Sequence, residues 1–222
     1  MFSYSINPDS TIDAENTLRS FIIGIFSGNA QVVTNVIEYE EPCAASMDIE
    51  DVKQSRDGNH EAYKRLIERH QQKIAKIMWR FSRDKLTHEE LVQDVFVEAY
   101  LSLTTYKNHA PFIHWLSKIA TRVGYRYWKE QARENNRKSF TLQKWDNVLA
   151  ESPGNMESEQ AAEMVHALLE QLPPRDRLVL TLRFLEGYDV EQTAYRTGWS
   201  KSMVKVQTIR AKAKLKKLFP EA

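Results

Sequence analysis

The fold of this chain is decided by the stretch LPPRDRLVLTLRFLEGYDVEQTAYRTGWSKSMVKVQTIRAKAKLKKL, which occupies residues 172–218. Asp189 is a residue type that caps helices, and Gln192 stands three positions later, where a capping box has its second member. Ala194 and Gly198 then supply the small side chain and the tight turn that allow two helices to cross closely. This pattern predicts a helix-turn-helix.

A second helix is predicted after the capping residue Ser200, apolar on one side and basic elsewhere. Its apolar positions repeat at spacings of four and three, which is typical of a buried face: Val204, Thr208, Ala211, Leu215 and Leu218. Its basic residues are Lys201, Lys205, Arg210, Lys212, Lys214, Lys216 and Lys217, with no acidic residue among them. Such a helix suits a DNA phosphate backbone, and the preceding turn favours DNA over the alternative of a solvated basic helix that ends a bundle.

Length and composition bound the class of protein. The 222 residues include 7 Gly and 7 Pro, and alternation of β-branched residues is scarce beyond the N-terminal part, so the chain is predicted to be mainly α. The single cysteine, Cys43, excludes an internal disulfide framework and a cysteine-based zinc site. No apolar run is long enough to span a membrane, and Met1–Asn7 has no basic residue, unlike a secretory signal. We expect a cytoplasmic protein without membrane insertion.

The net charge of +1 hides a strong segregation of charge along the chain. Six acidic residues and no Lys or Arg lie from Trp145 to Pro174, between basic blocks on either side. The cluster Ser152–Asn155 contains chain-breaking residues and marks a boundary. We expect two small helical domains joined by an acidic linker, with a small N-terminal extension. The expected ranges are 1–46 for the extension, 47–138 for the first domain, 139–157 for the linker and 158–222 for the second domain.

The first domain is predicted to be a bundle of three helices. The first helix has apolar residues and one histidine at helical spacing: Ala62, Leu66, His70, Ile74, Ile77, Met78 and Phe81. Thr87 is expected to cap the second helix, with Glu90 completing a capping box. That helix is expected to bury Leu91, Val95, Phe96, Ala99, Tyr100 and Leu103. Its other face is acidic, with Glu89, Glu90, Gln93, Asp94 and Glu98.

The third helix is expected to start at Pro111, a residue type favoured in the first turn. It would bury Phe112, Leu116, Ile119 and Val123. Basic residues at helical spacing line another face, with aromatic residues between them: Lys118, Arg122, Arg126, Lys129 and Arg133, with Trp115, Tyr125, Tyr127 and Trp128. Cations and rings in this arrangement suit single-stranded nucleic acid. Aromatic residues in a small bundle also form cores, so both roles stay open for Trp115, Tyr125 and Trp128.

Four segments resemble bacterial extracytoplasmic-function (ECF, group IV) sigma factors of the sigma-70 family. Residues 84–96, DKLTHEELVQDVF, resemble the helix that binds core RNA polymerase, and residues 112–120, FIHWLSKIA, resemble the promoter-melting segment. Residues 172–177 with 182–187 resemble the start of the C-terminal domain, and the helix-turn-helix follows. The resemblance covers Asp48 to Phe219 in the expected order.

This resemblance implies an alternative sigma factor that binds core RNA polymerase and directs promoter-specific transcription initiation. The polymerase would carry out the chemistry, so no enzyme, catalytic residue, cofactor or metal site is expected. The implied polymerase-binding residues are Glu90, Leu91, Gln93, Asp94, Phe96 and Glu98. The implied residues for melting and binding the promoter −10 element are Tyr106, Lys107, Asn108, His109, Lys118, Arg122, Tyr125, Arg126 and Lys129. The implied −35 residues are Ser200, Lys201, Ser202, Lys205, Val206, Gln207 and Arg210.

Three questions stay open at the level of sequence. Arg122 stands where the family commonly has Asn, and Val206 and Gln207 stand where it usually has Ser and Arg, so the promoter sequence does not carry over from relatives. Residues 1–46 resemble no known segment and are an ordered appendage, a flexible arm, or the product of a start upstream of Met47; their apolar runs favour a small ordered element. An anti-sigma partner and the inducing signal are also open.

Two other functions compete with the sigma-factor interpretation. A helix-turn-helix transcriptional regulator would not bind core polymerase stoichiometrically, and it would need a ligand-binding or receiver domain for which the sequence has no motif. An RNA-binding or adaptor protein would account for the basic and aromatic helix but not for the acidic helix or the helix-turn-helix. Binding to core polymerase distinguishes all three.

Overall fold

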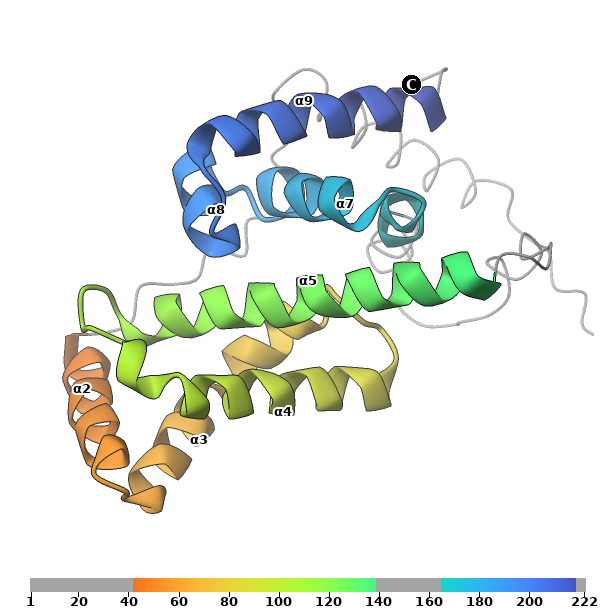
Figure 1. The fold of residues 1–222 in the computed structure, drawn as a ribbon. Helices are drawn as coiled ribbons and strands as arrows, with labels where there is room; N and C mark the ends of the chain where they lie inside the picture. Colours follow the sequence, from red (N-terminus) through yellow and green to blue (C-terminus); the bar gives the residue numbers. More distant parts are fainter. Residues whose placement is uncertain (1–41, 139–164, 219–222) are drawn as a thin grey trace, which may run out of the picture. The chain divides into compact units, whose positions relative to one another are not determined.

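The computed structural model describes residues 42–138 and 165–218, and every regular element in these two ranges is a helix (Figure 1). The mainly α class is therefore confirmed. The elements are α2 (Pro42–Arg56), α3 (His60–Met78), α4 (Lys85–Leu101), η1 (Leu103–Thr105), α5 (Phe112–Lys138), α7 (Pro174–Leu180), η2 (Thr181–Leu185), α8 (Val190–Thr197) and α9 (Lys201–Leu218). Residues 165–170 are also helical. Across the described ranges, no helix has the length and apolarity required to cross a bilayer.

The chain divides by its contacts into two compact units. Among the described residues, the first unit contains 42–131 with 191–200, and the second contains 132–138, 165–190 and 201–218. The domain limits expected from sequence are 47–138 and 158–222. They place α8 and α9 in one domain, whereas the contacts place these helices in different units, and the expected limits stay a prediction. The expected linker, 139–157, lies outside the described residues, as does the N-terminal extension up to residue 41.

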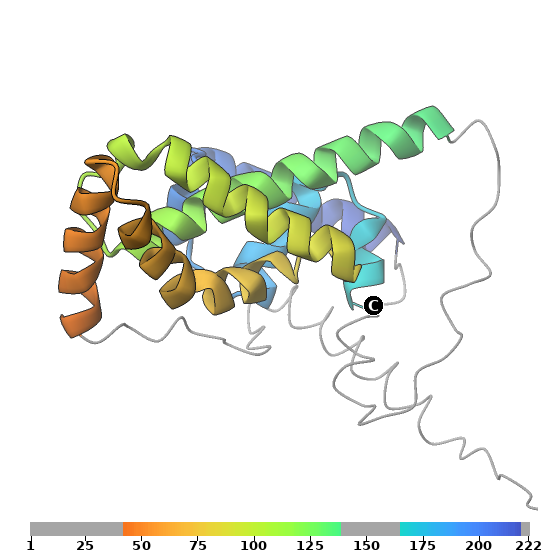
Figure 2. The ribbon, with the colours of Figure 1, turned by 90° about the horizontal axis from the view of Figure 1, so that it is seen from below.

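In the first unit, α2 packs on α3 and α3 packs on α4 (Figure 2). The predicted apolar face of α3 is confirmed, because all seven predicted residues from Ala62 to Phe81 are buried. Asn59 caps this helix by accepting hydrogen bonds from the backbone N–H groups of Glu61 and Ala62 at 3.0 and 3.2 Å.

The predicted cap of α4 is wrong by three residues. Asp84 has an extended backbone and accepts hydrogen bonds from the backbone N–H and the hydroxyl of Thr87, at 2.9 and 2.7 Å. Thr87 is thus the donor within the first turn, not the cap. These bonds hold the pKa of Asp84 below its ordinary value, because they favour the ionised carboxylate. Either residue type can cap, and the carboxylate is the better acceptor.

Helix α5 packs its predicted apolar face, Phe112, Leu116, Ile119 and Val123, into the core. Trp128 also belongs to the core: it is buried, and its indole Nε1 donates to the Phe81 carbonyl at 2.9 Å. Gly124 lies against the Phe81 ring so closely that a Cβ atom there would stand 2.3 Å from a ring carbon. The base-stacking alternative for Trp128 is therefore excluded.

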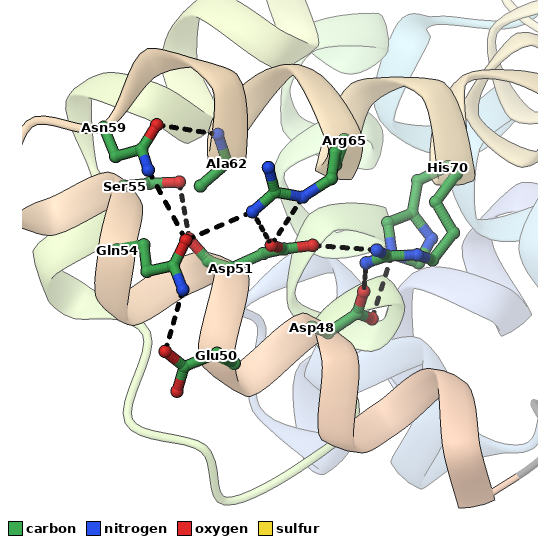
Figure 3. Close-up of polar contacts among 10 residues, drawn as sticks. Asp48, Glu50, Asp51, Gln54, Ser55, Asn59, Ala62, Arg65 and His70 are labelled. Carbon is green, nitrogen blue, oxygen red and sulfur yellow. Dashed lines mark hydrogen bonds and ion pairs between the residues drawn. The ribbon is translucent and has the colours of Figure 1, made fainter.

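Helix α2 is joined to α3 by buried ionic groups (Figure 3). Asp48 is fully buried and contacts His70 Nε2 at 3.0 Å and the Arg69 guanidinium. Asp51 accepts hydrogen bonds from Arg65 Nε at 2.9 Å and Arg69 Nη2 at 2.8 Å. Burial raises the pKa of Asp51, but the bonds from the two arginines outweigh it and hold this pKa below the ordinary value. The ionic groups fix α2 against α3.

In the second unit, α7 packs on α9. The buried residues of α9 are Val204, Gln207, Ala211 and Leu215, whereas Leu218 is exposed and Thr208 is half-buried. The predicted stripe is thus wrong at two of its five positions. A π-helical turn, η2, follows α7, and it is closed by a hydrogen bond of 3.0 Å from the Glu186 N–H to the Thr181 carbonyl.

Candidate functional site

The outer face of α4 combines acidic and large apolar side chains. Glu90, Gln93 and Asp94 are exposed, as predicted. Leu86, Val97 and Leu101 are 71%, 57% and 76% exposed. Helical geometry places residues 86, 90, 93, 97 and 101 along one side of the helix. We call this set, with Asp94 at its edge, the α4 outer face.

Three residues expected to bind polymerase occupy other places. Leu91 and Phe96 are buried in the bundle core, so they cannot contact a partner in this fold. Glu98 forms an ion pair with Arg126 of α5. The sequence signal for the missed residues was the spacing of Leu86, Val97 and Leu101. These three residues were overlooked because the predicted buried side and the predicted acidic side of this helix include none of them.

The loop between η1 and α5 has a fixed base and an exposed tip. Tyr106 is buried, and its hydroxyl donates to the Ala110 carbonyl at 2.8 Å. Its ring packs against Phe112 and Trp115, with centroids 5.4 and 5.5 Å away. The tip residues Lys107, Asn108 and His109 are all exposed. Three of the four predicted −10 residues in this loop therefore face solvent. The fourth, Tyr106, is buried at the base of the loop.

The basic face of α5 is present as predicted. Arg122, Arg126, Lys129 and Arg133 are exposed, and Lys118 is half-buried. Burial and the neighbouring Arg122 guanidinium lower the pKa of Lys118. Tyr125 is half-buried, and Lys129 Nζ lies 5.7 Å from the centre of its ring. Cations and one aromatic ring thus share a surface, which suits phosphates and an unstacked base.

On α9 and at the residue before it, six of the seven predicted −35 residues are exposed: Ser200, Lys201, Ser202, Lys205, Val206 and Arg210. Gln207 is the exception and corrects the prediction. It is only 7% exposed, and its amide Nε2 donates to Asp176 Oδ1 of α7 at 2.5 Å. Lys214 Nζ contacts the other oxygen of Asp176 at 2.6 Å. An amide held inside the unit cannot reach a base edge.

A residue that sequence reasoning missed lies on the same face of α9 as Val206. Ile209 is 69% exposed and Val206 is 48% exposed, three positions apart on one side of the helix. The signal was an isoleucine outside the buried period. Within the described ranges, no group of three or more His, Cys, Asp or Glu side chains is placed to hold a metal ion.

Comparison with known proteins identifies both helical regions. Residues 66–134 match the family model for sigma-70 region 2, and residues 162–215 match that for sigma-70 region 4. The ECF RNA polymerase sigma factor SigX of Bacillus subtilis is 26% identical over 162 residues, which are 71% of this chain and 83% of SigX. The ECF RNA polymerase sigma-E factor of Escherichia coli K12 is 29% identical over 158 residues, or 64% of this chain and 78% of the relative.

Two solved structures are among the matches. CnrH, in complex with the cytosolic domain of CnrY, matches with a TM-score of 0.49 and 24% identity, covering 78% of this chain and 97% of CnrH. The sigma factor RpoE of Bartonella quintana, in complex with the anti-sigma factor NepR, matches with a TM-score of 0.49 and 18% identity, covering 72% of this chain and 97% of RpoE.

Proposed function

Because this chain belongs to the extracytoplasmic-function branch of the sigma-70 family, as an alternative sigma factor that directs transcription initiation through RNA polymerase, we propose that three of its surfaces divide the work. The α4 outer face docks on core polymerase, on the coiled coil of its large subunit. The loop after η1 and the basic face of α5 hold the melted −10 element. The exposed side of α9 reads the −35 element.

The observation that carries the polymerase interface is the composition of the α4 outer face. Leu86, Val97 and Leu101 are 57–76% exposed along one side of a helix whose opposite side is core, and such a row of large apolar side chains is costly to leave in water. Partner surfaces commonly bury such apolar anchors inside a polar rim. The acidic residues Glu90 and Asp94 complement a basic partner and steer the encounter.

Replacement of one exposed leucine tests this interface. Leu101→Ser should weaken binding to core polymerase by roughly tenfold or more, as the loss of a buried anchor does. The circular dichroism and melting temperature should stay unchanged, because the side chain is exposed in the free protein. Ile209→Ser on α9 is the matched control: it removes a similarly exposed apolar side chain and should leave polymerase binding intact.

Two outcomes would contradict the assignment. Equal losses from Leu101→Ser and Ile209→Ser would show that exposed apolar residues act nonspecifically. If the unmodified chain fails to bind core polymerase stoichiometrically, the alternative of a helix-turn-helix regulator takes precedence.

The −10 assignment rests on the loop tip and the basic face of α5. Lys107, Asn108 and His109 offer hydrogen-bonding groups on a supported loop, and the exposed cations of α5 offer a track for the backbone of a single strand. Arg122 is part of that track, in place of the Asn common in relatives. Its guanidinium contacts a phosphate or stacks on a base, so base preference at this position is expected to differ from that of relatives.

The −35 assignment rests on α9. The exposed Lys201, Lys205 and Arg210 position the helix on phosphates, and Val206 contacts base edges through apolar groups such as the thymine methyl. Ile209 extends this apolar contact. Since Gln207 is turned inward, it takes no part in base reading.

Members of this family are regulatory initiation factors, and the chemistry of RNA synthesis belongs to the polymerase. We therefore assign no catalytic residue to this chain. We infer that it acts in the cytoplasm, where the polymerase works. RpoE of Bartonella quintana is bound to an anti-sigma factor. By extension, an anti-sigma protein is a partner class for this chain as well.

A further inference from the structure

We propose that Arg56, the last residue of α2, is a positioning residue that holds the loop after η1 in the shape needed to receive a −10 base. The inference rests on the proposed function of that loop. Arg56 lies outside the predicted DNA-binding residues, and it acts on backbone atoms of the loop instead of on DNA.

The guanidinium of Arg56 ties α2 to the entrance of the loop. Its Nη2 donates to the Leu103 carbonyl at 2.8 Å and also to the Tyr106 carbonyl, and its Nε donates to Leu103 at 3.3 Å. Leu103 is the first residue of the short η1 turn, and Tyr106 directly follows its last residue. A planar guanidinium presents several donors in a fixed fork, so one side chain fixes the direction of both carbonyls.

The far side of the loop is closed by Tyr106. Its hydroxyl donates to the Ala110 carbonyl at 2.8 Å, and its buried ring packs against Phe112 and Trp115. Between these two ends, Asn108 adopts a φ of 55°, the left-handed conformation that costs free energy for most residues with a side chain and less for Asn. The tip is thus held in one unusual conformation by contacts at its base.

A loop held in its binding conformation does not lose conformational freedom when a base enters. If the clamp is removed, the carbonyls of Leu103 and Tyr106 lose their shared donor, and the tip samples other conformations. The effect on DNA would be strongest for recognition of one base, because base selection requires fixed donors and acceptors, whereas backbone attraction requires only charge.

Fold stability depends little on this arginine. Its side chain is exposed to solvent, and α2 is already joined to α3 by the ion pairs of Asp48 and Asp51. The contributions of Arg56 to the fold and to the loop are therefore separable by mutation.

The test uses the full chain assembled with core RNA polymerase and a randomised single-stranded DNA pool as probe. We compare Arg56→Met, which keeps length but removes the donors, with Arg56→Lys and with Lys53→Met. Lys53 is an exposed cation on the same helix, one turn earlier, so its replacement matches the change in charge. Affinity, base preference in the selected pool, melting temperature and core binding are measured for each.

We expect Arg56→Met to lower single-strand affinity by about tenfold, the scale of one misplaced base contact, and to flatten base preference at one position. Arg56→Lys should recover part of both, since an ammonium group can reach one of the carbonyls. Lys53→Met should behave as the unmodified chain. Melting temperature and core binding should not change in any variant.

Three results would overturn the inference. Unchanged affinity and base preference in Arg56→Met would exclude a clamp. Equal losses in Arg56→Met and Lys53→Met, with base preference retained, would show that Arg56 contributes only charge. Parallel falls in melting temperature and core binding would show a structural role alone. Failure of the unmodified holoenzyme to bind any single strand is a distinct result, because it would refute the proposed function of the loop and, with it, the clamp.

Discussion

Gln207 shows how one buried amide determines which side of a DNA-facing helix is available. Its hydrogen bond to Asp176, together with the contact of Lys214 on the same carboxylate, satisfies an acid whose side chain is 2% exposed. A buried carboxylate without such partners is strongly destabilising. Gln207 therefore points inward because its amide supplies a hydrogen bond to the buried Asp176 carboxylate. The preceding residue, Val206, faces solvent.

Replacement of Gln207 and Val206 should separate stability from base reading. Gln207→Ala should lower the free energy of unfolding by about 1–3 kcal/mol, because Asp176 loses one of its partners. The bases selected at −35 from a randomised promoter library should stay the same. Val206→Ala should have little effect on the free energy of unfolding measured by urea denaturation, but it should alter the base preference. A new base preference in Gln207→Ala would mean that the amide reaches DNA after all.

Single residues also mark where sequence reasoning stops. The period of α3 was sufficient to predict its buried residues from Ala62 to Phe81, because helical spacing alone determines one face. Trp128 could not be assigned, since its place in the core depends on the Phe81 carbonyl and on the missing side chain of Gly124. Those contacts join residues more than forty positions apart, which no local pattern encodes.

At the scale of an element, the cations of α9 fall into two groups. One group is exposed: Lys201, Lys205, Arg210, Lys216 and Lys217. In the other group, Lys214 is exposed but paired with Asp176, and Lys212 is half-buried with its Nζ 4.6 Å from the centre of the Phe184 ring. Burial and the nearby Arg183 lower the pKa of Lys212. A basic helix is therefore not uniformly available to phosphates.

Salt dependence of promoter binding should distinguish the two groups. Lys205→Ala and Arg210→Ala should each reduce the slope of log affinity against log salt by roughly one unit, since each removes one phosphate contact. Lys214→Ala, the matched control, should leave the slope intact and lower the melting temperature, because it removes an ion partner of Asp176. Slopes that are unchanged in Lys205→Ala and Arg210→Ala would place the phosphate contacts elsewhere.

Helix α4 shows why an element can be predicted and its interface missed. Its existence and its acidic face follow from the sequence, but its apolar residues serve two surfaces. Leu91, Val95 and Phe96 fill the core, and Leu86 and Leu101 face outward. Composition alone cannot divide leucines between a core and a partner, because both environments exclude water.

At the scale of the whole molecule, the proposed surfaces fall into different units. The α4 outer face, the loop tip and the basic face of α5 up to residue 131 belong to the first unit, and α9 belongs to the second. Polymerase docking and −10 melting should therefore respond to substitutions in the first unit and −35 reading to those in the second. The two family matches follow the order of the chain instead: the region 4 match, 162–215, includes residues 191–200 of the first unit as well as α9 of the second.

At the N-terminal end of the first unit, helix α2 bears on where a functional chain can start. The sequence offered Met47 as a start, but α2 begins at Pro42, so a chain starting at Met47 would begin inside the helix. Asp48, which is fully buried and bonded to His70, would then be the second residue of a frayed end. Breaking a buried ion pair in this way is costly.

Three chains, starting at Met1, Pro42 and Met47, would resolve the role of this region. The Met47 chain should melt at a lower temperature than the Pro42 chain, because the ionic contacts of Asp48 require a formed first turn. The Pro42 chain should bind core polymerase and transcribe a cognate promoter as well as the full chain, as expected if residues 1–41 recruit a partner or stabilise the fold. A more active Pro42 chain would instead show that those residues mask the polymerase- or DNA-binding surfaces, with tethering as the source of their effective concentration. Equal melting temperatures of the Met1 and Pro42 chains would leave recruitment, since a stabilising segment must lower the melting temperature when it is removed.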